Sequence, residues 1–270
     1  MPVINTNVNS LIAQQALTNN NRSLGKAMEQ LSTGKRINSA ADDAAGLSIS
    51  NKLTAQIRGL NQGVRNANDA ISMVQTAEGA TKTVTDMLQR MRELGVQAAN
   101  GTNSTADKAS LQKEFLELQT EIKRIATTTS WNGRNLTGTQ ASALQFQVGA
   151  NSGQVITVTF KNIATITAVS AAVNTTSAST ATVVSKLDSA IAAIDSFRSD
   201  MGAKINRLTY AADNLTNVST NTAASRSRIL DADYAQATTE LARSQIIQQA
   251  ATAMLAQANQ APQSVLSLLR

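Results

Sequence analysis

The chain has no cysteine and no histidine among its 270 residues. The absence of these two residue types excludes disulfide bonds, thiol and imidazole nucleophiles, and most zinc sites. The only two prolines, Pro2 and Pro262, stand near the two ends, so the strongest helix breaker is missing from everything between them. One tryptophan, two tyrosines and four phenylalanines are the only aromatic residues, and none precedes Phe115. This composition favours thin layers of aliphatic side chains between long helices over a thick globular core.

Segments that would direct the chain into a membrane are also missing. No apolar run reaches the roughly 18 residues that a membrane-spanning helix needs. The residues before Arg22 include no Lys or Arg and no apolar run, so we expect no cleavable secretory signal. The net charge is +6, but basic and acidic residues are mixed along the chain and both ends are nearly neutral. We therefore expect neither nucleic acid nor a membrane surface as a partner.

Apolar residues recur at helical spacing at both ends of the chain, with no neighbouring segment to cover them. Near the start they are Ile4, Val8, Leu11, Leu17, Leu24, Met28 and Leu31. Near the end they are Leu230, Tyr234, Ala237, Leu241, Ile247, Ala251, Met254 and Ala258. Residues at this spacing lie along one side of a helix, so each arm has to pair with the other arm, with other copies of the chain or with lipid. The near neutrality of both arms argues against an anionic lipid surface.

Three further stretches with helical periodicity lie between the arms. They cover residues 57–99, 107–127 and 187–215, and Asp107 is the expected cap of the second. The first stretch has a polar interval at Glu78 and Thr81, and the third is interrupted at Arg198. Packed together, they predict a mainly α fold with a long antiparallel rod, a three-helix bundle, over residues 45–229. Because the chain goes out along one helix and returns along another, both arms should emerge at the same end of this rod.

The periodicity changes from helical to alternating in the middle of the chain. Apolar residues at Leu144, Phe146 and Val148 are followed by a turn at residues 151–153 and then by Ile156, Val158 and Phe160. This pattern predicts a β-hairpin over residues 143–161 with one face buried on helices. Residues 163–182 carry no charge and are almost wholly Ala, Thr, Ser, Val and Asn, so we expect an exposed, variable tip there.

No arrangement of residues points to catalysis. The two acidic pairs are Asp42 with Asp43 and Asp231 with Asp233, and both precede predicted helices, where carboxylates cap the helix and complement its dipole. Glycoside or metal chemistry instead needs carboxylates that face each other across a gap. The sequence has no HExxH, no glycine-rich phosphate loop and no GxSxG. We expect a protein that is not an enzyme and that holds no metal or cofactor.

Five segments together identify a family. They are the opening residues 2–17, LSTGKRINSAADDAAGL at 31–47, QRMRELGVQ at 89–97, the Trp131-Asn-Gly133 turn, and VLSLLR at 265–270. In order and at both ends of the chain, these segments resemble bacterial flagellin. The resemblance covers residues 1–160 and 183–270. Larger flagellins insert outer domains where this chain has only residues 163–182, so it resembles a short flagellin that lacks the large outer variable domains.

The resemblance implies a structural subunit that self-assembles into the bacterial flagellar filament used for swimming. The arms, residues 1–44 and 230–270, would form a two-helix coiled-coil terminal domain in the inner tube, and residues 45–229 the outer wall. The residues implied in polymerisation are Leu11, Leu17, Leu24, Met28, Leu31, Leu241, Ile247 and Met254. The family also implies secretion by type III export to the extracellular flagellum, an export chaperone on the C-terminal arm, and contacts with filament cap and hook-associated proteins.

The resemblance gives a further meaning to the polar residues near position 90. From residue chemistry alone they form, together with Leu94, a solvated helix face with ion pairs that points away from Leu88 and Met91. Stimulatory flagellins present matching positions to a host Toll-like receptor, here Gln89, Arg90, Leu94, Gln97 and Glu114. The C-terminal leucines that cytosolic host sensors read match Leu266, Leu268 and Leu269. Gly95 departs from the Ala common in this motif, and we expect it to loosen the helix by up to about 1 kcal/mol.

Two alternatives remain open at this stage. A hook-filament junction protein of the same superfamily would share the terminal helices. A monomeric helical bundle, secreted as an adhesin or effector, would use the arms to stabilise itself instead of joining copies.

Overall fold

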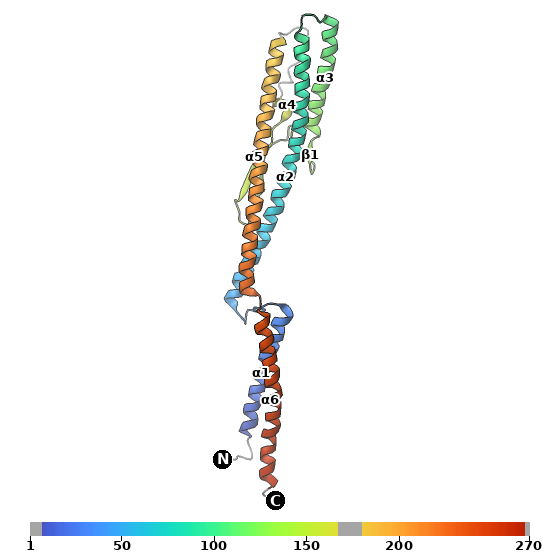
Figure 1. Cartoon of the computed structure of the whole chain (residues 1–270). Helices are drawn as coiled ribbons and strands as arrows, with labels where there is room; N and C mark the ends of the chain where they lie inside the picture. Colours follow the sequence, from blue (N-terminus) through green and yellow to red (C-terminus); the bar gives the residue numbers. More distant parts are fainter. Residues whose placement is uncertain (1–6, 167–179, 268–270) are drawn as a thin grey trace. The chain divides into compact units, whose positions relative to one another are not determined.

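The computed structural model describes residues 7–166 and 180–267 (Figure 1). The helices are α1 (Val8–Thr33), α2 (Ala44–Ala99), α3 (Thr105–Thr128), α4 (Ile163–Ile166), α5 (Thr180–Leu230) and α6 (Tyr234–Ser267). The strands are β1 (Ser130–Trp131), β2 (Arg134–Asn135), β3 (Ala143–Gln147) and β4 (Val155–Thr159). These elements confirm the predicted mainly α fold. They divide into two compact units, one formed by residues 56–220 and the other by residues 1–55 and 221–270.

Helices α2, α3 and α5 pack into the predicted three-helix bundle within residues 56–220. In Figure 1, α3 and α5 both run antiparallel to α2. One buried cluster joins the three helices: Val84, Leu88, Met91 and Leu94 of α2, Phe115, Ile122 and Ala126 of α3, and Val183, Leu187, Ala190 and Ile194 of α5. The apolar spacing of each helix places these side chains on the faces that meet, which explains why three separate stretches form one bundle.

The hairpin of β3 and β4 takes the place of a third helix in a second buried cluster. The two strands are antiparallel, with Phe146 opposite Ile156 and Leu144 opposite Val158. Ile156, Val158 and Phe160 pack with Ala67, Ala70, Met73, Val74 and Ala77 of α2 and with Phe197, Met201 and Leu208 of α5. Residues 143–161 thus form the predicted hairpin, and its apolar face covers the helices.

The polar interruptions in the two long helices lie opposite each other. An Arg198 guanidinium nitrogen lies 3.0 Å from the Glu78 carboxylate, and the Thr81 hydroxyl donates to the Glu78 carbonyl at 2.8 Å. The Nε of Arg198 is buried without a hydrogen-bond partner among the described residues. The polar interval of α2 at Glu78 therefore lies opposite the polar interruption of α5 at Arg198. The antiparallel register of the two helices brings these two side chains together.

Local signals in the sequence set several element boundaries. Helix α1 ends at Thr33 and is followed by Gly34, whose φ of +69° is the left-handed conformation expected of a glycine just after a helix. The two-residue turn between β1 and β2 has positive φ at both Asn132 and Gly133, as a type I′ hairpin requires. The cap of α3 differs from the prediction. Ser104 is the capping residue and Asp107 completes a capping box with it, because the helix begins at Thr105, two residues before Asp107.

The start of the predicted exposed tip is buried. Ile163 is 0% exposed within the cluster that contains Phe115, and its backbone N–H donates to the Thr137 carbonyl at 2.8 Å. The expectation of an exposed segment is therefore wrong at Ile163. This residue comes directly after the hairpin, and its apolar side chain packs in the core. Residues 167–179 of the predicted tip lie outside the described residues.

Gly95 offers a direct test of the packing of α2 against α5. A Cβ added at Gly95 would lie 3.6 Å from Val184 and 3.7 Å from Val183, both ordinary contact distances. We expect Gly95→Ala to raise the free energy of unfolding by about 0.5–1 kcal/mol, because alanine loses less backbone entropy in a helix. Equilibrium unfolding in urea measures this change.

Gly63→Ala is the matched control in the same helix. Its Cβ would lie 3.0 Å from the Val148 carbonyl oxygen of the hairpin, so this variant should lose stability. Equal effects of the two substitutions would contradict the packing described here.

Candidate assembly surface

Helices α1 and α6 form an antiparallel pair within the unit of residues 1–55 and 221–270. Side-chain hydrogen bonds cross between them at several levels. Asn7 donates to the Ala258 carbonyl at 2.7 Å, Asn20 to the Ser244 carbonyl at 2.8 Å, and the Tyr234 hydroxyl to the Leu31 carbonyl at 3.3 Å. Further bonds join Ser10 to Asn259 and Gln248 to Asn21. The two arms therefore pair in a register that polar groups specify.

The seam between α1 and α6 is narrow. Its buried residues are Asn20, Ala27, Ala237 and Ser244, all of them small or polar. Of the apolar residues named from the sequence, Leu17, Leu24, Leu31 and Leu241 are only half-buried. Pairing of the arms thus covers part of their apolar stripes and leaves the rest exposed.

Large apolar side chains remain exposed on both helices. We call Leu11, Ile12, Met28, Ile246, Ile247 and Met254 the terminal apolar surface. Four of these residues were predicted, whereas Ile12 and Ile246, which are 62% and 66% exposed, were missed. Each follows or precedes a predicted stripe position by one residue. Two pairs of adjacent apolar residues, Leu11-Ile12 and Ile246-Ile247, were the signal in the sequence for a stripe too wide for one partner helix.

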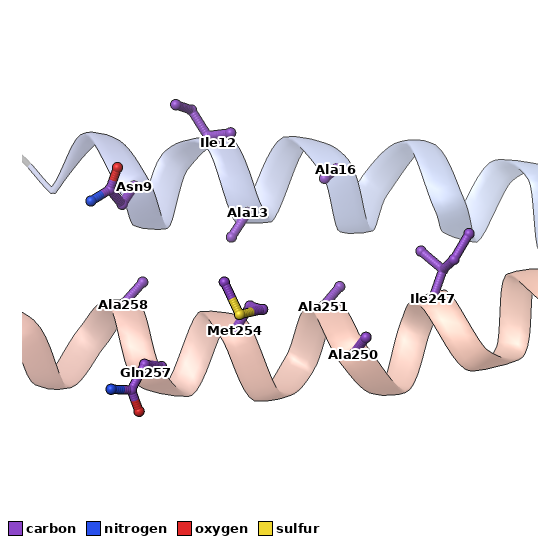
Figure 2. Close-up of a pocket in the computed structure, with 10 residues that line it drawn as sticks. All are labelled: Asn9, Ile12, Ala13, Ala16, Ile247, Ala250, Ala251, Met254, Gln257 and Ala258. Carbon is purple, nitrogen blue, oxygen red and sulfur yellow. The ribbon is translucent and has the colours of Figure 1, made fainter.

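An apolar groove of about 640 Å³ lies between α1 and α6. It is lined by Asn9, Ile12, Ala13, Ala16, Ile247, Ala250, Ala251, Met254, Gln257 and Ala258. Figure 2 shows Ala13 and Met254 projecting from the two helices into the space between them. The alanine side chains are too small to fill this space, and none of the lining residues is charged. A groove of this kind favours an apolar occupant.

A tight loop links α1 to α2 and is tied to the segment that precedes α6. The Arg36 N–H donates to the Leu230 carbonyl at 2.7 Å, and the Ala232 N–H to the Gly34 carbonyl at 3.0 Å. Lys26 of α1 lies 2.9 Å from the Asp42 carboxylate. This ammonium group, together with the backbone N–H groups of Ser39 and Asn38, holds the pKa of the Asp42 carboxyl well below its usual range.

The two acidic pairs divide their roles. Asp43 accepts from the Gly46 N–H at 2.8 Å and caps α2, and Asp233 accepts from the Ala235 N–H at 2.9 Å and caps α6. The prediction that the acidic residues cap helices is wrong for Asp42 and Asp231. Asp42 holds the loop, and Asp231 pairs through its backbone with Lys35, because in each pair only the residue nearer the helix reaches its first N–H groups.

The polar residues near position 90 form an exposed network on α2, α3 and α5. Arg90 contacts Glu114 at 2.9 Å and Glu93 at 3.0 Å, and Arg92 contacts Asp188 at 2.6 Å. The bonds to Glu114 and Glu93 raise the pKa of Arg90. Gln89 and Gln97 are also exposed.

Leu94 does not share this exposed face. The expectation that it does is wrong, since its side chain is 2% exposed and packs in the same cluster as Leu88 and Met91. The spacing of three residues from Met91 turns Leu94 toward the core. Of the predicted C-terminal positions, Leu266 belongs to α6, and Leu268 and Leu269 lie outside the described residues.

We also searched the described part of the chain for a metal site and for a membrane-spanning helix. Within residues 7–166 and 180–267, acidic side chains do not gather into a group of three or more that could hold a metal ion. None of the described helices is both long enough and apolar enough to cross a membrane.

Acid should weaken the loop that Asp42 holds. A carboxyl group whose pKa is lowered by folding contributes stability above its unfolded pKa of about 4, and this contribution is lost as the pH falls below that value. We expect Asp42→Asn to lower the melting temperature at pH 7 and the difference from wild type to narrow progressively below about pH 4. Thermal unfolding followed by circular dichroism measures both effects. A difference that stays constant down to pH 2 would contradict this role of Asp42.

Asn20 should contribute to the pairing of the arms. Removing its amide in Asn20→Ala breaks a buried hydrogen bond, which costs about 1 kcal/mol, so the amides of α1 should exchange hydrogen roughly fivefold faster. Hydrogen exchange with mass spectrometry measures this rate. Asn19→Ala, which changes an exposed neighbour, is the matched control. Equal exchange in the two variants would show that the Asn20 bond is not needed.

Comparison with known proteins finds relatives along nearly the whole chain. Residues 4–142 match the family model for the bacterial flagellin N-terminal helical region, and residues 184–269 match that for the C-terminal helical region. A flagellin of Halalkalibacterium halodurans is 46% identical over 271 aligned positions, which cover 99% of this chain and 100% of the relative. Flagellin E of Vibrio cholerae serotype O1 is 36% identical over 373 aligned positions, with 99% of each chain covered. The first relative is thus about as long as this chain, whereas the second is longer.

Solved structures also resemble the chain. The crystal structure of Bacillus cereus flagellin has a TM-score of 0.52 and 35% identity, and the match covers 60% of this chain and 94% of that one. A putative flagellar hook-associated protein from Vibrio parahaemolyticus has a TM-score of 0.61 at 14% identity, covering 70% of this chain and 100% of that one. The second likeness concerns the fold alone.

Proposed function

Because the chain belongs to the bacterial flagellin family, and is a structural subunit of the flagellar filament, we propose that the terminal apolar surface is where copies of the subunit join. The observation that carries the proposal is the exposure of large apolar side chains on α1 and α6 even after the two helices have paired. Exposed apolar patches of this kind are typical of association sites. We assign the inner-tube coiled coil to residues 1–44 and 230–270 and the outer wall to residues 45–229.

Burial of this surface contributes favourably to assembly. Burying the exposed part of one Leu, Ile or Met side chain gains about 1 kcal/mol, so the six residues supply roughly 6 kcal/mol per copy before the entropy of association is subtracted. Each subunit in a helical polymer meets several neighbours, and contacts to them add together. A surface that is modest in one subunit can therefore hold a long filament.

The same surface supports the other partners of the arms. We propose that an export chaperone covers the C-terminal arm before secretion through the flagellar type III apparatus, and that filament cap and hook-associated proteins meet the arms at the filament ends. The exposed Ile246, Ile247 and Met254 of α6 support this, because they are apolar side chains that need a cover in water. The chain has no catalytic task in this proposal and acts only as a structural protein.

Recognition by a host is proposed for two further regions. Gln89, Arg90, Gln97 and Glu114 are exposed and fit a polar contact with a Toll-like receptor, whereas the buried Leu94 is left out of that contact. The C-terminal leucines Leu266, Leu268 and Leu269 are proposed as the segment that cytosolic sensors read. The junction-protein and monomeric-adhesin alternatives are not favoured, because the relatives that match nearly the full chain are flagellins.

Charged substitutions on the terminal apolar surface test the proposal. Ile12→Glu and Ile247→Glu place a charge where a neighbouring copy has to pack, so the rate at which monomer elongates short filament seeds should fall about tenfold or more. Since both side chains are exposed in the subunit, its helix content and urea midpoint should stay unchanged. Elongation is counted by electron microscopy.

Val96→Glu provides the control, since Val96 is also an exposed apolar residue but lies on α2 outside the terminal apolar surface. Elongation by the Ile12 and Ile247 variants at the wild-type rate would overturn the proposal.

A further inference from the structure

The methionines of the chain differ sharply in exposure. Of the described methionines, Met73, Met91 and Met201 are buried and Met87 packs partly against the core. Met28 and Met254 are 57% and 65% exposed, and both belong to the terminal apolar surface. A dissolved oxidant therefore reaches these two sulfur atoms without any opening of the fold, whereas the buried sulfurs are protected.

Met254 differs from Met28 in its surroundings. It lines the groove between α1 and α6 together with Ile12, Ala13 and Ile247, whereas Met28 does not. Figure 2 shows its side chain directed toward α1. The only side chains in the lining that can donate a hydrogen bond are those of Asn9 and Gln257. Its thioether thus forms part of an apolar wall.

We infer that oxidation of Met254 to the sulfoxide switches off the joining of copies. A two-electron oxidant such as hydrogen peroxide transfers one oxygen atom to the Met254 sulfur and leaves as water, which converts the thioether to a sulfoxide. The new S=O group is a strong hydrogen-bond acceptor. Packing a second copy against it would bury this acceptor among Ile12, Ala13 and Ile247, whose side chains offer no donor. The inference rests on the proposed function of the terminal apolar surface.

The chemistry makes this switch reversible and specific to the free subunit. Methionine sulfoxide is reduced back to methionine by sulfoxide reductases, so the change is not final. A subunit within a filament has Met254 covered by its neighbours and is oxidised more slowly than the monomer. Since Met254 contributes no buried contact to the core, its oxidation leaves the folded subunit intact.

Limited oxidation followed by seeded elongation tests the inference. Monomer is treated with limiting hydrogen peroxide, oxygen addition is mapped by peptide mass spectrometry, and elongation of untreated seeds is measured. Met28 and Met254 should gain oxygen before Met73, Met87, Met91 and Met201, the urea midpoint should not change, and elongation should fall about tenfold or more. A double variant, Met28→Leu with Met254→Leu, which conserves volume at both exposed sites, should elongate seeds equally well before and after treatment. Met28→Leu alone is the matched control and should lose elongation as wild type does.

Two results would overturn the inference alone. They are normal elongation by Met28→Leu monomer that carries the sulfoxide at Met254, and loss of elongation by the treated double variant. Untreated wild-type monomer that never elongates seeds would overturn both the inference and the proposed function. The untreated arm therefore separates the two failures.

Discussion

The pairing of α1 with α6 determines which apolar side chains of the two arms stay exposed. Small and polar residues, such as Ala27, Ala237 and Ser244, fill the seam between the two helices, and side-chain hydrogen bonds fix their register. These small and polar residues cover little of the apolar surface of the two helices. Larger side chains, such as Ile12 and Met254, therefore stay exposed on the pair, where a further partner has to cover them.

In the bundle of α2, α3 and α5, apolar residues at the same helical spacing are buried within the chain itself. There, Leu88, Phe115 and Ile194 turn inward and are completely or almost completely buried, so this part of the chain satisfies its own apolar faces. The chain thus contains one region whose core is complete and another whose apolar surface is left available. A self-assembling subunit needs both, because it has to fold alone and still bind copies of itself.

Residue spacing was sufficient to predict the helices, the hairpin and the apolar stripes of the arms, because those features follow from local periodicity. Residue spacing was not sufficient where tertiary packing determines whether a side chain is buried or exposed. Leu94 and Gly95 are neighbours that both face the core, and Ile163 is the apolar start of a polar segment. The pairing of Glu78 with Arg198 was visible only as two interruptions until the antiparallel register brought them together. Which apolar residues of the arms stay exposed depended on the width of the seam, which spacing does not reveal.

A map of the assembled filament by electron cryomicroscopy would show directly whether copies join through the terminal apolar surface. Filaments grown from the purified protein should show Ile12, Ile247 and Met254 packed against side chains of neighbouring copies, with α1 and α6 still paired as they are within one chain. Filaments in which these three side chains face solvent, and in which copies touch only through residues 56–220, would show that the terminal apolar surface does not join copies.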